Sequence, residues 1–305
     1  MWTLADMPPQ TGRYAIVTGT GGLGYETAVA LAGAGASVLV AGRNAAKGDE
    51  ALDRIRRAHP AADIAFAPLD LASLASIAAF AERMAAVDRP IDLLVNNAGV
   101  MTPPDRRLTA DGFELQFGTN HLGHFALTGR LLPLLRRGAT PRVVTVSSGA
   151  HHVGRIDFDN LQWERRYSPF IAYGASKLAN LMFALELQRR SEVAGWGLMS
   201  LAAHPGYART DLIANGPGLD SWMSKIGRTL IEPWASQSAA AGALPQLFAA
   251  TSPDAVGGGY YGPSRLMELV GPPGPARVAQ RARDRATAKR LWEVSEQLTG
   301  VDFGA

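Results

Sequence analysis

The feature of this sequence that most constrains its fold is a series of short, largely apolar runs separated by segments of helical spacing. The runs do not alternate with polar residues, which is the pattern of strands in a parallel sheet buried on both faces. In the first half we expect strands at Tyr14–Thr18, Ser37–Ala41, Ile64–Ala67, Ile91–Val95 and Arg142–Val146. Between them we expect helices at Glu26–Ala34, Lys47–Ala58 and Leu74–Ala86, and a largely helical stretch at Leu115–Leu135. This order predicts an α/β fold: a single Rossmann-type, doubly wound parallel β-sheet flanked by helices on both faces.

The second half continues the pattern at wider spacing. We expect a loop at residues 149–172, a helix at Tyr173–Arg190, a strand at Gly197–Ala203, a helix at Ser236–Ala250 and a last short strand and turn at Tyr260–Pro263. Residues 211–235 are rich in Gly, Trp, Met and Leu and predict an apolar lid, and residues 276–299 predict a helical tail. No linker or repeat divides the chain, so residues 1–305 are expected to form one domain.

Composition excludes several classes of site. The chain has no cysteine, which excludes a disulfide scaffold, a thiolate zinc site, an iron–sulfur cluster and a cysteine nucleophile. The basic residues number 30 and the acidic residues 27, and residues 277–290 alone hold six basic residues and one acidic residue. We interpret this basic stretch as a solvated helix face, and we expect neither a nucleic-acid partner nor a metal site. No leader and no apolar run of about 18 residues occurs, so we expect a cytoplasmic protein without a membrane span.

A glycine-rich turn lies between the first expected strand and the first expected helix. It reads Thr18-Gly19-Thr20-Gly21-Gly22-Leu23-Gly24, in which Gly19, Gly21 and Gly24 fit the pattern G-x-G-x-x-G. Glycines permit a tight turn and let the backbone approach a pyrophosphate at the N-terminus of a helix. The strand–turn–helix context predicts a dinucleotide site, although the same pattern also occurs in plain tight turns.

The end of the second expected strand bears on which dinucleotide is bound. It reads Ala41-Gly42-Arg43-Asn44, and no acidic residue stands between Ser37 and Ala46 to hold a ribose 2′-hydroxyl. Arg43 stands there instead, with Lys47 one helical turn later. Cations at this place favour a 2′-phosphate, so we expect NADP(H) in preference to NAD(H). The alternative is that Arg43 is an ordinary surface arginine in a chain with many arginines.

Tyr173 and Lys177 stand four residues apart in the pattern Y-x-x-x-K, so both lie on one face of the expected helix. A phenol with its ordinary pKa of about 10 is a poor base at neutral pH. A neighbouring cation favours the phenolate and lowers that pKa. The pair therefore predicts proton exchange with an alcohol or a carbonyl group.

Together with four further motifs, these residues resemble the short-chain dehydrogenase/reductase family over roughly residues 13–262. The motifs are Asn96-Asn97-Ala98-Gly99, Asn120, Ser147-Ser148 and Pro205-Gly206, each after or near an expected strand or helix. Longer matches are similar to the retinol-dehydrogenase-like branch of the family; they are Phe117–Phe125, Val146–His151 and Ser176–Asn180.

The resemblance implies a role for each matching residue. Tyr173 would be the general acid/base, Lys177 would lower its pKa and bind the nicotinamide ribose, Ser148 would bond the substrate carbonyl, and Asn120 would hold the geometry and a proton-relay water. The remaining cofactor contacts implied by the resemblance, or by the turn and strand end above, are Gly19, Gly21, Gly22, Leu23, Gly24, Arg43, Asn44, Lys47, Asp70, Leu71, Asn97, Ala98, Gly99, Pro205, Gly206 and Thr210.

Two details depart from the usual family pattern. Ser148 stands 25 residues before Tyr173, a longer spacing than is usual, but the retinol-dehydrogenase-like branch has a comparable insertion, so we prefer Ser148 to Ser147. Ser147 is interpreted as strand-end packing. The glycine turn is one residue shorter than the family's T-G-x-x-x-G-x-G, which puts the affinity for the cofactor in question more than the chemistry.

These observations predict an NADP(H)-dependent oxidoreductase that interconverts a lipophilic or aromatic ketone or aldehyde and its alcohol by hydride transfer. Two alternatives stay open: a catalytically silent NADP-sensing regulator, and an extended-type epimerase or dehydratase. The resemblance also implies a homodimer or homotetramer, because the family often pairs the helix that begins at Tyr173 across a two-fold axis.

Overall fold

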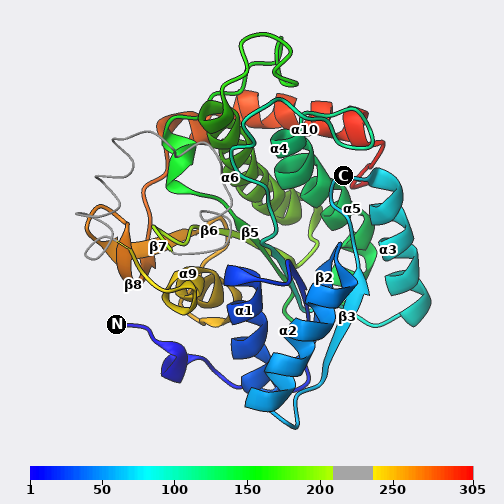
Figure 1. Cartoon of the computed structure of the whole chain (residues 1–305), viewed down its shortest axis with the longest axis vertical. Helices are drawn as coiled ribbons and strands as arrows, with labels where there is room; N and C mark the ends of the chain where they lie inside the picture. Colours follow the sequence, from blue (N-terminus) through cyan, green and yellow to red (C-terminus); the bar gives the residue numbers. More distant parts are fainter. Residues whose placement is uncertain (209–235, 305) are drawn as a thin grey trace.

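The computed structural model describes residues 1–208 and 236–304. Its centre is one eight-stranded sheet in the order β3-β2-β1-β4-β5-β6-β7-β8 (Figure 1). The bounds of the strands are Tyr14–Thr18 (β1), Ser37–Gly42 (β2), Ile64–Pro68 (β3), Leu93–Asn96 (β4), Arg142–Val146 (β5), Met199–Ala203 (β6), Tyr260–Arg265 (β7) and Val270–Pro275 (β8). The first seven strands pair in parallel, which confirms the doubly wound Rossmann-type fold.

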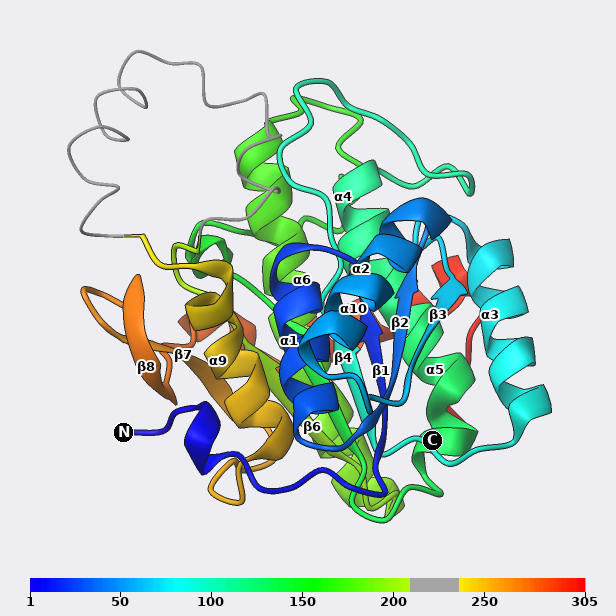
Figure 2. The same ribbon diagram turned by 60° about the horizontal axis from the view of Figure 1, so that its bottom comes forward.

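Helices cover both faces of the sheet (Figures 1 and 2). Alternate residues of a strand point to opposite faces, and in β1 Ile16 packs in one core while Val17 packs in the other. The core that contains Val17 lies under α1 (Gly22–Gly33), α2 (Ala45–Ala58) and α9 (Ala239–Thr251). The core that contains Ile16 lies under α3 (Leu74–Val87), α5 (Gly123–Leu135) and α6 (Pro169–Ala194). Because both faces are buried, the central strands can be apolar throughout.

The edge strand β8 differs from the expected all-parallel sheet. It pairs antiparallel with β7 through a short hairpin. Its sequence, Val270-Gly-Pro-Pro-Gly-Pro, reads as a turn, because proline cannot donate to a sheet ladder. Proline is tolerated at a sheet edge, where the missing donors face away from the sheet.

The segment 149–172 is not a plain loop. Residues Gly149–His152 form a 3₁₀ turn (η3), and α6 begins at Pro169, four residues before the expected start. Proline at the first helical position is favourable, since its fixed φ suits the helix and its missing N–H would have no partner there. The helix ends at Ala194, and its C-cap, Gly195, adopts φ of 64°.

The C-terminal tail packs on the molecule as well as facing solvent. A 3₁₀ turn (η5, Gln280–Arg283) precedes α10 (Arg285–Thr299), which Asp284 caps through bonds to the amides of Ala286 and Thr287. Trp292 of α10 is 2% exposed and packs against Phe125 of α5 and Phe183 of α6. The basic residues of α10 stay exposed, so the expected solvated face is one side of an amphipathic helix. Part of the outer side of α6, where pairing with a second copy was expected, is covered by α10.

No helix among residues 1–208 and 236–304 is long and apolar enough to cross a bilayer.

Candidate active site

A cavity of about 1300 Å³ opens along the carboxyl ends of the parallel strands. Strand order reverses between β1 and β4, and ligands of such folds bind in the crevice at this point. Most of the predicted site residues line the cavity: Gly19, Gly21, Gly22, Leu23, Arg43, Asn44, Lys47, Asp70, Leu71, Asn97, Ala98, Gly99, Ser148, Tyr173, Lys177, Pro205 and Gly206. Gly24 and Asn120 lie behind the wall of the cavity, while Thr210 and the expected lid at 211–235 fall outside the described residues.

The glycine turn forms the floor of one end of the cavity. Gly19 has φ of 102°, which a residue with a side chain rarely adopts, and its amide donates to the carbonyl of Ala41 at 2.8 Å. A Cβ on Gly24 would lie 2.5 Å from the carbonyl oxygen of Gly19, so the turn folds closely on itself. Helix α1 begins at Gly22 with Gly21 as its N-cap. The turn that is one residue short therefore still presents a helix N-terminus to the cavity.

Thr18 ties this turn to the loop after β4. Its hydroxyl oxygen accepts from the amides of Asn97 at 2.9 Å and Ala98 at 3.0 Å, and the side-chain amide of Asn97 donates to the Thr18 carbonyl at 2.8 Å. These bonds join the glycine turn and the loop after β4, which are about 80 residues apart in the sequence, into one wall of the cavity.

The part of the cavity beside α2 is rich in cations. Arg43 and Lys47 both line it and are exposed, as expected, and the sequence interpretation missed Arg54, which lines it from the next turns of α2. Glu50 adds one carboxylate to this part. The side chain of Asn44 accepts from the amide of Lys47 at 3.0 Å and so caps α2.

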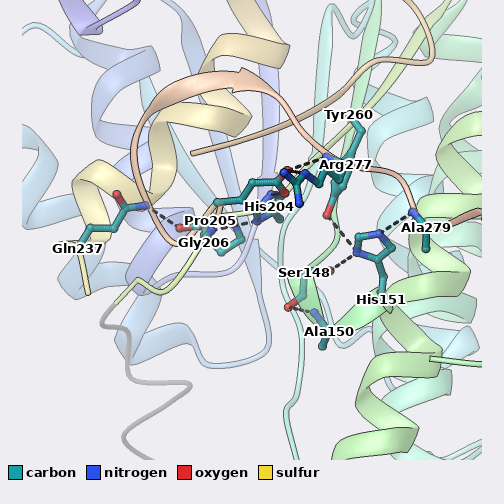
Figure 3. Close-up of polar contacts among 11 residues, drawn as sticks. Ser148, Ala150, His151, His204, Pro205, Gly206, Gln237, Tyr260, Arg277 and Ala279 are labelled. Carbon is teal, nitrogen blue, oxygen red and sulfur yellow. Dashed lines mark hydrogen bonds and ion pairs between the residues drawn. The ribbon is translucent and has the colours of Figure 1, made fainter. Parts of the chain in front are cut away.

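Tyr173 and Lys177 lie one turn apart on α6 and are 7% and 4% exposed. The Lys177 Nζ donates to the carbonyl of Val146 at 3.0 Å and lies 5.7 Å from the centre of the Tyr173 ring. The side chain of Ser148 lines the same cavity and acts to lower the pKa of Tyr173. Its Oγ also accepts from the amide of Ala150 at 3.2 Å, which caps η3 (Figure 3). Three polar side chains from two elements therefore meet at one point of the cavity.

The pKa values of this group differ from the expectation that Lys177 lowers the pKa of Tyr173. Burial raises the pKa of Tyr173 to about 12, and Ser148 only partly opposes this. Burial also lowers the pKa of Lys177 to about 8. The reason is that both groups leave water, and burial disfavours the charged form of each. Tyr173 is therefore a neutral phenol at neutral pH, suited to donating a proton.

Asn120 lies in a π-helical turn (Gly118–Leu122) between α4 (Leu115–Phe117) and α5 and is fully buried. Its side chain accepts from the Val100 amide at 2.8 Å, and it donates to the Val100 carbonyl at 3.0 Å and to Ser176 Oγ at 2.9 Å. Its backbone carbonyl lies 3.0 Å from His124 Nδ1. Asn120 thus joins the loop after β4 to α6 without reaching the cavity.

Comparison with known proteins identifies the family. The family model described as short chain dehydrogenase matches residues 13–217. Polyprenol dehydrogenase of Mus musculus is 41% identical over 305 residues, covering 98% of this chain and 87% of that protein. Retinol dehydrogenase 12 of Homo sapiens is 40% identical, covering 95% of this chain and 87% of that protein. This chain belongs to the short-chain dehydrogenase family.

Solved structures agree on the fold of this short-chain dehydrogenase. The crystal structure of an uncharacterised protein from Mycobacterium paratuberculosis aligns with a TM-score of 0.83 at 42% identity, covering 100% of this chain and 99% of that one. The Pseudomonas aeruginosa RhlG/NADP active-site complex aligns with a TM-score of 0.64 at 25% identity, covering 83% of this chain and 96% of that one. The resemblance to the retinol-dehydrogenase-like branch is confirmed.

Short-chain dehydrogenases use an NAD(P) cofactor, and the residues of this chain fit one. The glycine turn brings backbone close to the cavity at a helix N-terminus, which suits a pyrophosphate. Lys177 and Tyr173 stand at the other end of the same cavity, where a nicotinamide would meet a substrate. Among the described residues, no group of three or more His, Asp or Glu side chains could hold a metal ion.

Two features of the site lay outside the sequence interpretation. His124 of α5 lies 3.0 Å from the Thr18 hydroxyl through Nε2 and 3.0 Å from the Asn120 carbonyl through Nδ1, which links the π-helical turn to the glycine turn. The β7–β8 hairpin adds Met267, Glu268 and Leu269 to the cavity wall. The hairpin was missed because β8 reads as a turn. The helical spacing from Asn120 to His124 was the one signal that could have found His124.

Ser147 occupies the position expected of a packing residue. It is 1% exposed, and its hydroxyl donates to the Lys177 carbonyl at 2.7 Å. Both serines line the cavity, but the Ser147 hydroxyl is bonded to Lys177, so the half-buried Ser148 is the serine placed to meet a ligand.

Proposed function

We propose that this short-chain dehydrogenase is an NADP(H)-dependent oxidoreductase that interconverts a lipophilic or aromatic ketone or aldehyde and its alcohol. The observation that carries the proposal is the meeting of Ser148, Tyr173 and Lys177 in a cavity that continues to the glycine turn and to Arg43. The bound cofactor supplies or accepts the hydride. The protein supplies orientation, proton transfer and stabilisation of charge.

In the reducing direction Ser148 and Tyr173 would both hydrogen-bond the substrate oxygen. Negative charge develops on that oxygen during reduction, and two fixed donors stabilise it. The Tyr173 hydroxyl then gives up its proton to that oxygen, which its neutral state at neutral pH allows. Lys177 holds a positive charge one turn away, and this charge favours the transient phenolate.

The cavity and the relatives support an apolar substrate. Val100, Met101, Phe170, Met267 and Leu269 line the cavity around the catalytic residues. The named relatives are a polyprenol dehydrogenase and a retinol dehydrogenase, whose names denote long, apolar alcohols. A retinoid-like or isoprenoid-like aldehyde or ketone is therefore the substrate class that we propose.

NADP(H) preference, assembly and location belong to the same proposal. Arg43, Lys47 and Arg54 offer three cations to a 2′-phosphate against the single carboxylate of Glu50.

A homodimer or homotetramer stays a prediction, and an interface on the covered part of α6 would have to include or displace α10. A cytoplasmic location also stays a prediction.

A panel of carbonyl compounds tests the proposal. NADPH consumption would be followed with retinaldehyde, with isoprenoid and aromatic aldehydes and ketones, and with small polar ketones and sugars. The proposal predicts kcat/KM at least about tenfold higher for the apolar group, because each buried CH₂ contributes about 0.8 kcal/mol. Turnover confined to small polar carbonyls would contradict it.

A further inference from the structure

A buried histidine joins the loop that carries Ser148 to the C-terminal segment (Figure 3). His151 lies in η3, three residues after Ser148, and is 1% exposed. Its Nδ1 is 2.7 Å from the Ser148 carbonyl oxygen, and its Nε2 is 3.2 Å from the backbone nitrogen of Ala279. A carbonyl can only accept and a backbone amide can only donate, so Nδ1 carries the proton and Nε2 does not. The two contacts fix one neutral tautomer.

The surroundings of His151 keep the ring neutral and in place. The ring meets the Tyr260 ring edge to face at 5.4 Å and lies over the His152 ring at 4.0 Å. Burial lowers the pKa of His151 to about 4, although the bond to Ser148 opposes this. The ring therefore keeps the same donor and acceptor at neutral pH.

Residues 276–283, which we call the strap, contact the Ser148 loop at two places. Ala279 donates to His151, and the Arg281 guanidinium donates to the Gly154 carbonyl at 2.6 Å. The Ala276 amide donates to the Tyr260 carbonyl at 2.8 Å, which anchors the start of the strap on the sheet. The strap thus holds residues 148–154 at the middle and at the C-terminal end of that loop.

Residues 148–154 also pack closely against the turn of α6 that carries Tyr173. A Cβ on Gly154 would lie 2.2 Å from the Gly174 carbonyl oxygen, and a Cβ on Gly174 would lie 2.8 Å from the Ala150 carbonyl oxygen. The two backbones touch because both positions are glycine. A shift of the loop would therefore change the position of Ser148 relative to Tyr173.

We propose that His151 is a positioning residue: it transmits the anchorage of the strap to Ser148 and so sets the placement of the Ser148 hydroxyl beside Tyr173. The inference rests on the proposed function, since its consequence is a rate of turnover. Misplacing a reacting group by about 1 Å can cost up to about a hundredfold in rate, so a modest loop shift has a measurable effect.

Two variants separate the contacts of His151. In His151→Asn the side-chain amide can still donate to the Ser148 carbonyl, because its nitrogen takes the place of Nδ1, but the acceptor for Ala279 is lost. In His151→Gln the side-chain oxygen can take the place of Nε2 and accept from Ala279, but the donor to Ser148 is lost. We expect His151→Gln to lower kcat with retinaldehyde about tenfold, with KM for NADPH within about twofold of wild type. We expect His151→Asn to lower kcat to a similar extent, because transmission from the strap to Ser148 needs both contacts of the ring.

Wild-type kcat in either variant would overturn the inference. A variant that fails to fold is replaced by a matched pair on the strap. Arg281→Ala removes the bond to Gly154, while Arg283→Ala removes an exposed side chain with no hydrogen bond or ion pair to the described residues. We expect Arg281→Ala, and not Arg283→Ala, to raise hydrogen exchange of peptides covering residues 148–154 and to lower kcat.

Hydrogen exchange also separates this inference from the proposed function. Absence of turnover by the wild-type enzyme would contradict the proposed function. Exchange at residues 148–154 that Arg281→Ala leaves unchanged would contradict the inference, whether or not the enzyme turns over.

Discussion

At the scale of single residues, the catalytic group consists of polar side chains held out of water. Lys177 has a backbone carbonyl and no carboxylate as its partner among the described residues, and burial lowers its pKa to about 8. The compact ammonium of Lys177 fits this buried site, whereas a planar guanidinium would bring more N–H donors that each need a partner. The chain has only four lysines, and Lys177 is the one that lies one helical turn from Tyr173, the proposed proton donor.

The rate of reduction should depend on the charge of Lys177. Because its pKa lies near 8 and that of Tyr173 near 12, raising the pH removes the lysine proton first. We expect kcat/KM for NADPH-dependent reduction to fall about tenfold for each pH unit above about 8. Initial rates from pH 6 to pH 10 measure this, and a flat profile up to pH 10 would contradict it.

Arg43 should decide much of the cofactor preference. We expect wild type to favour NADPH over NADH, and Arg43→Ala to lower kcat/KM for NADPH about tenfold with less than a twofold change for NADH. A charge-assisted bond to a phosphate contributes about 1.5–3 kcal/mol, which sets this scale. Arg57→Ala, on the helix α2 that follows Arg43 and outside the cavity, is the control. Equal efficiency of wild type with both cofactors would contradict the assignment.

Sequence predicted this site as far as local patterns reach. The glycine turn and the Tyr173–Lys177 pair have fixed spacings along the chain, so their residues could be named and placed together. His151 and His124 could not be assigned, because their partners Ala279 and Thr18 are more than 100 residues away. The raised pKa of Tyr173 also required the structure, since burial of its side chain decides it.

At the scale of elements, strands inside the sheet were easier to predict than the edge strand β8. The central strands β1 and β2 were predicted to within one residue because burial on both faces demands an unbroken apolar run. Strand β8 could not be predicted, because its prolines and glycines are typical of a turn. The strand pairs only with β7, at the edge of the sheet. Helix α6 begins earlier than predicted, because Pro169 is its first residue. In the sequence, a proline at this place is equally typical of the end of a loop.

Helix α10 should be part of the folded core. We expect Trp292→Ala to lower the free energy of unfolding by about 3–5 kcal/mol, because Trp292 fills the space between Phe125, Phe183 and Phe303. Lys289→Ala, exposed on the same helix, should change it by less than about 0.5 kcal/mol. Urea unfolding of both variants measures the difference. Equal stabilities would show that α10 does not stabilise the α5–α6 face.

At the scale of the whole molecule, buried neutral histidines make stability depend on pH. Burial lowers the pKa of His124 to about 4, and the charge of Lys177 adds to this, while the bond to the Asn120 carbonyl opposes it. The unfolded chain has a histidine pKa of about 6.5 and binds protons that the folded protein does not. Stability that His124 contributes is therefore present above pH 6.5 and is lost as the pH falls toward 4.

His124 alone should account for about 2 kcal/mol of lost stability between pH 7 and pH 5. Urea unfolding at both pH values, for wild type and for His124→Asn, measures this contribution. We expect the variant to be less stable at pH 7 and to lose about 2 kcal/mol less on acidification. A loss as large as that of wild type would mean that His124 is not held neutral in the folded state.

The most direct test of the account is proton donation by Tyr173. Turnover of NADPH with retinaldehyde would be measured for wild type and for Tyr173→Phe, together with NADPH affinity from the fluorescence of the bound cofactor. The account predicts that Tyr173→Phe lowers kcat by about 10²–10⁴-fold, the usual contribution of a general acid, and changes NADPH affinity by less than about threefold. An undiminished kcat in Tyr173→Phe would contradict it.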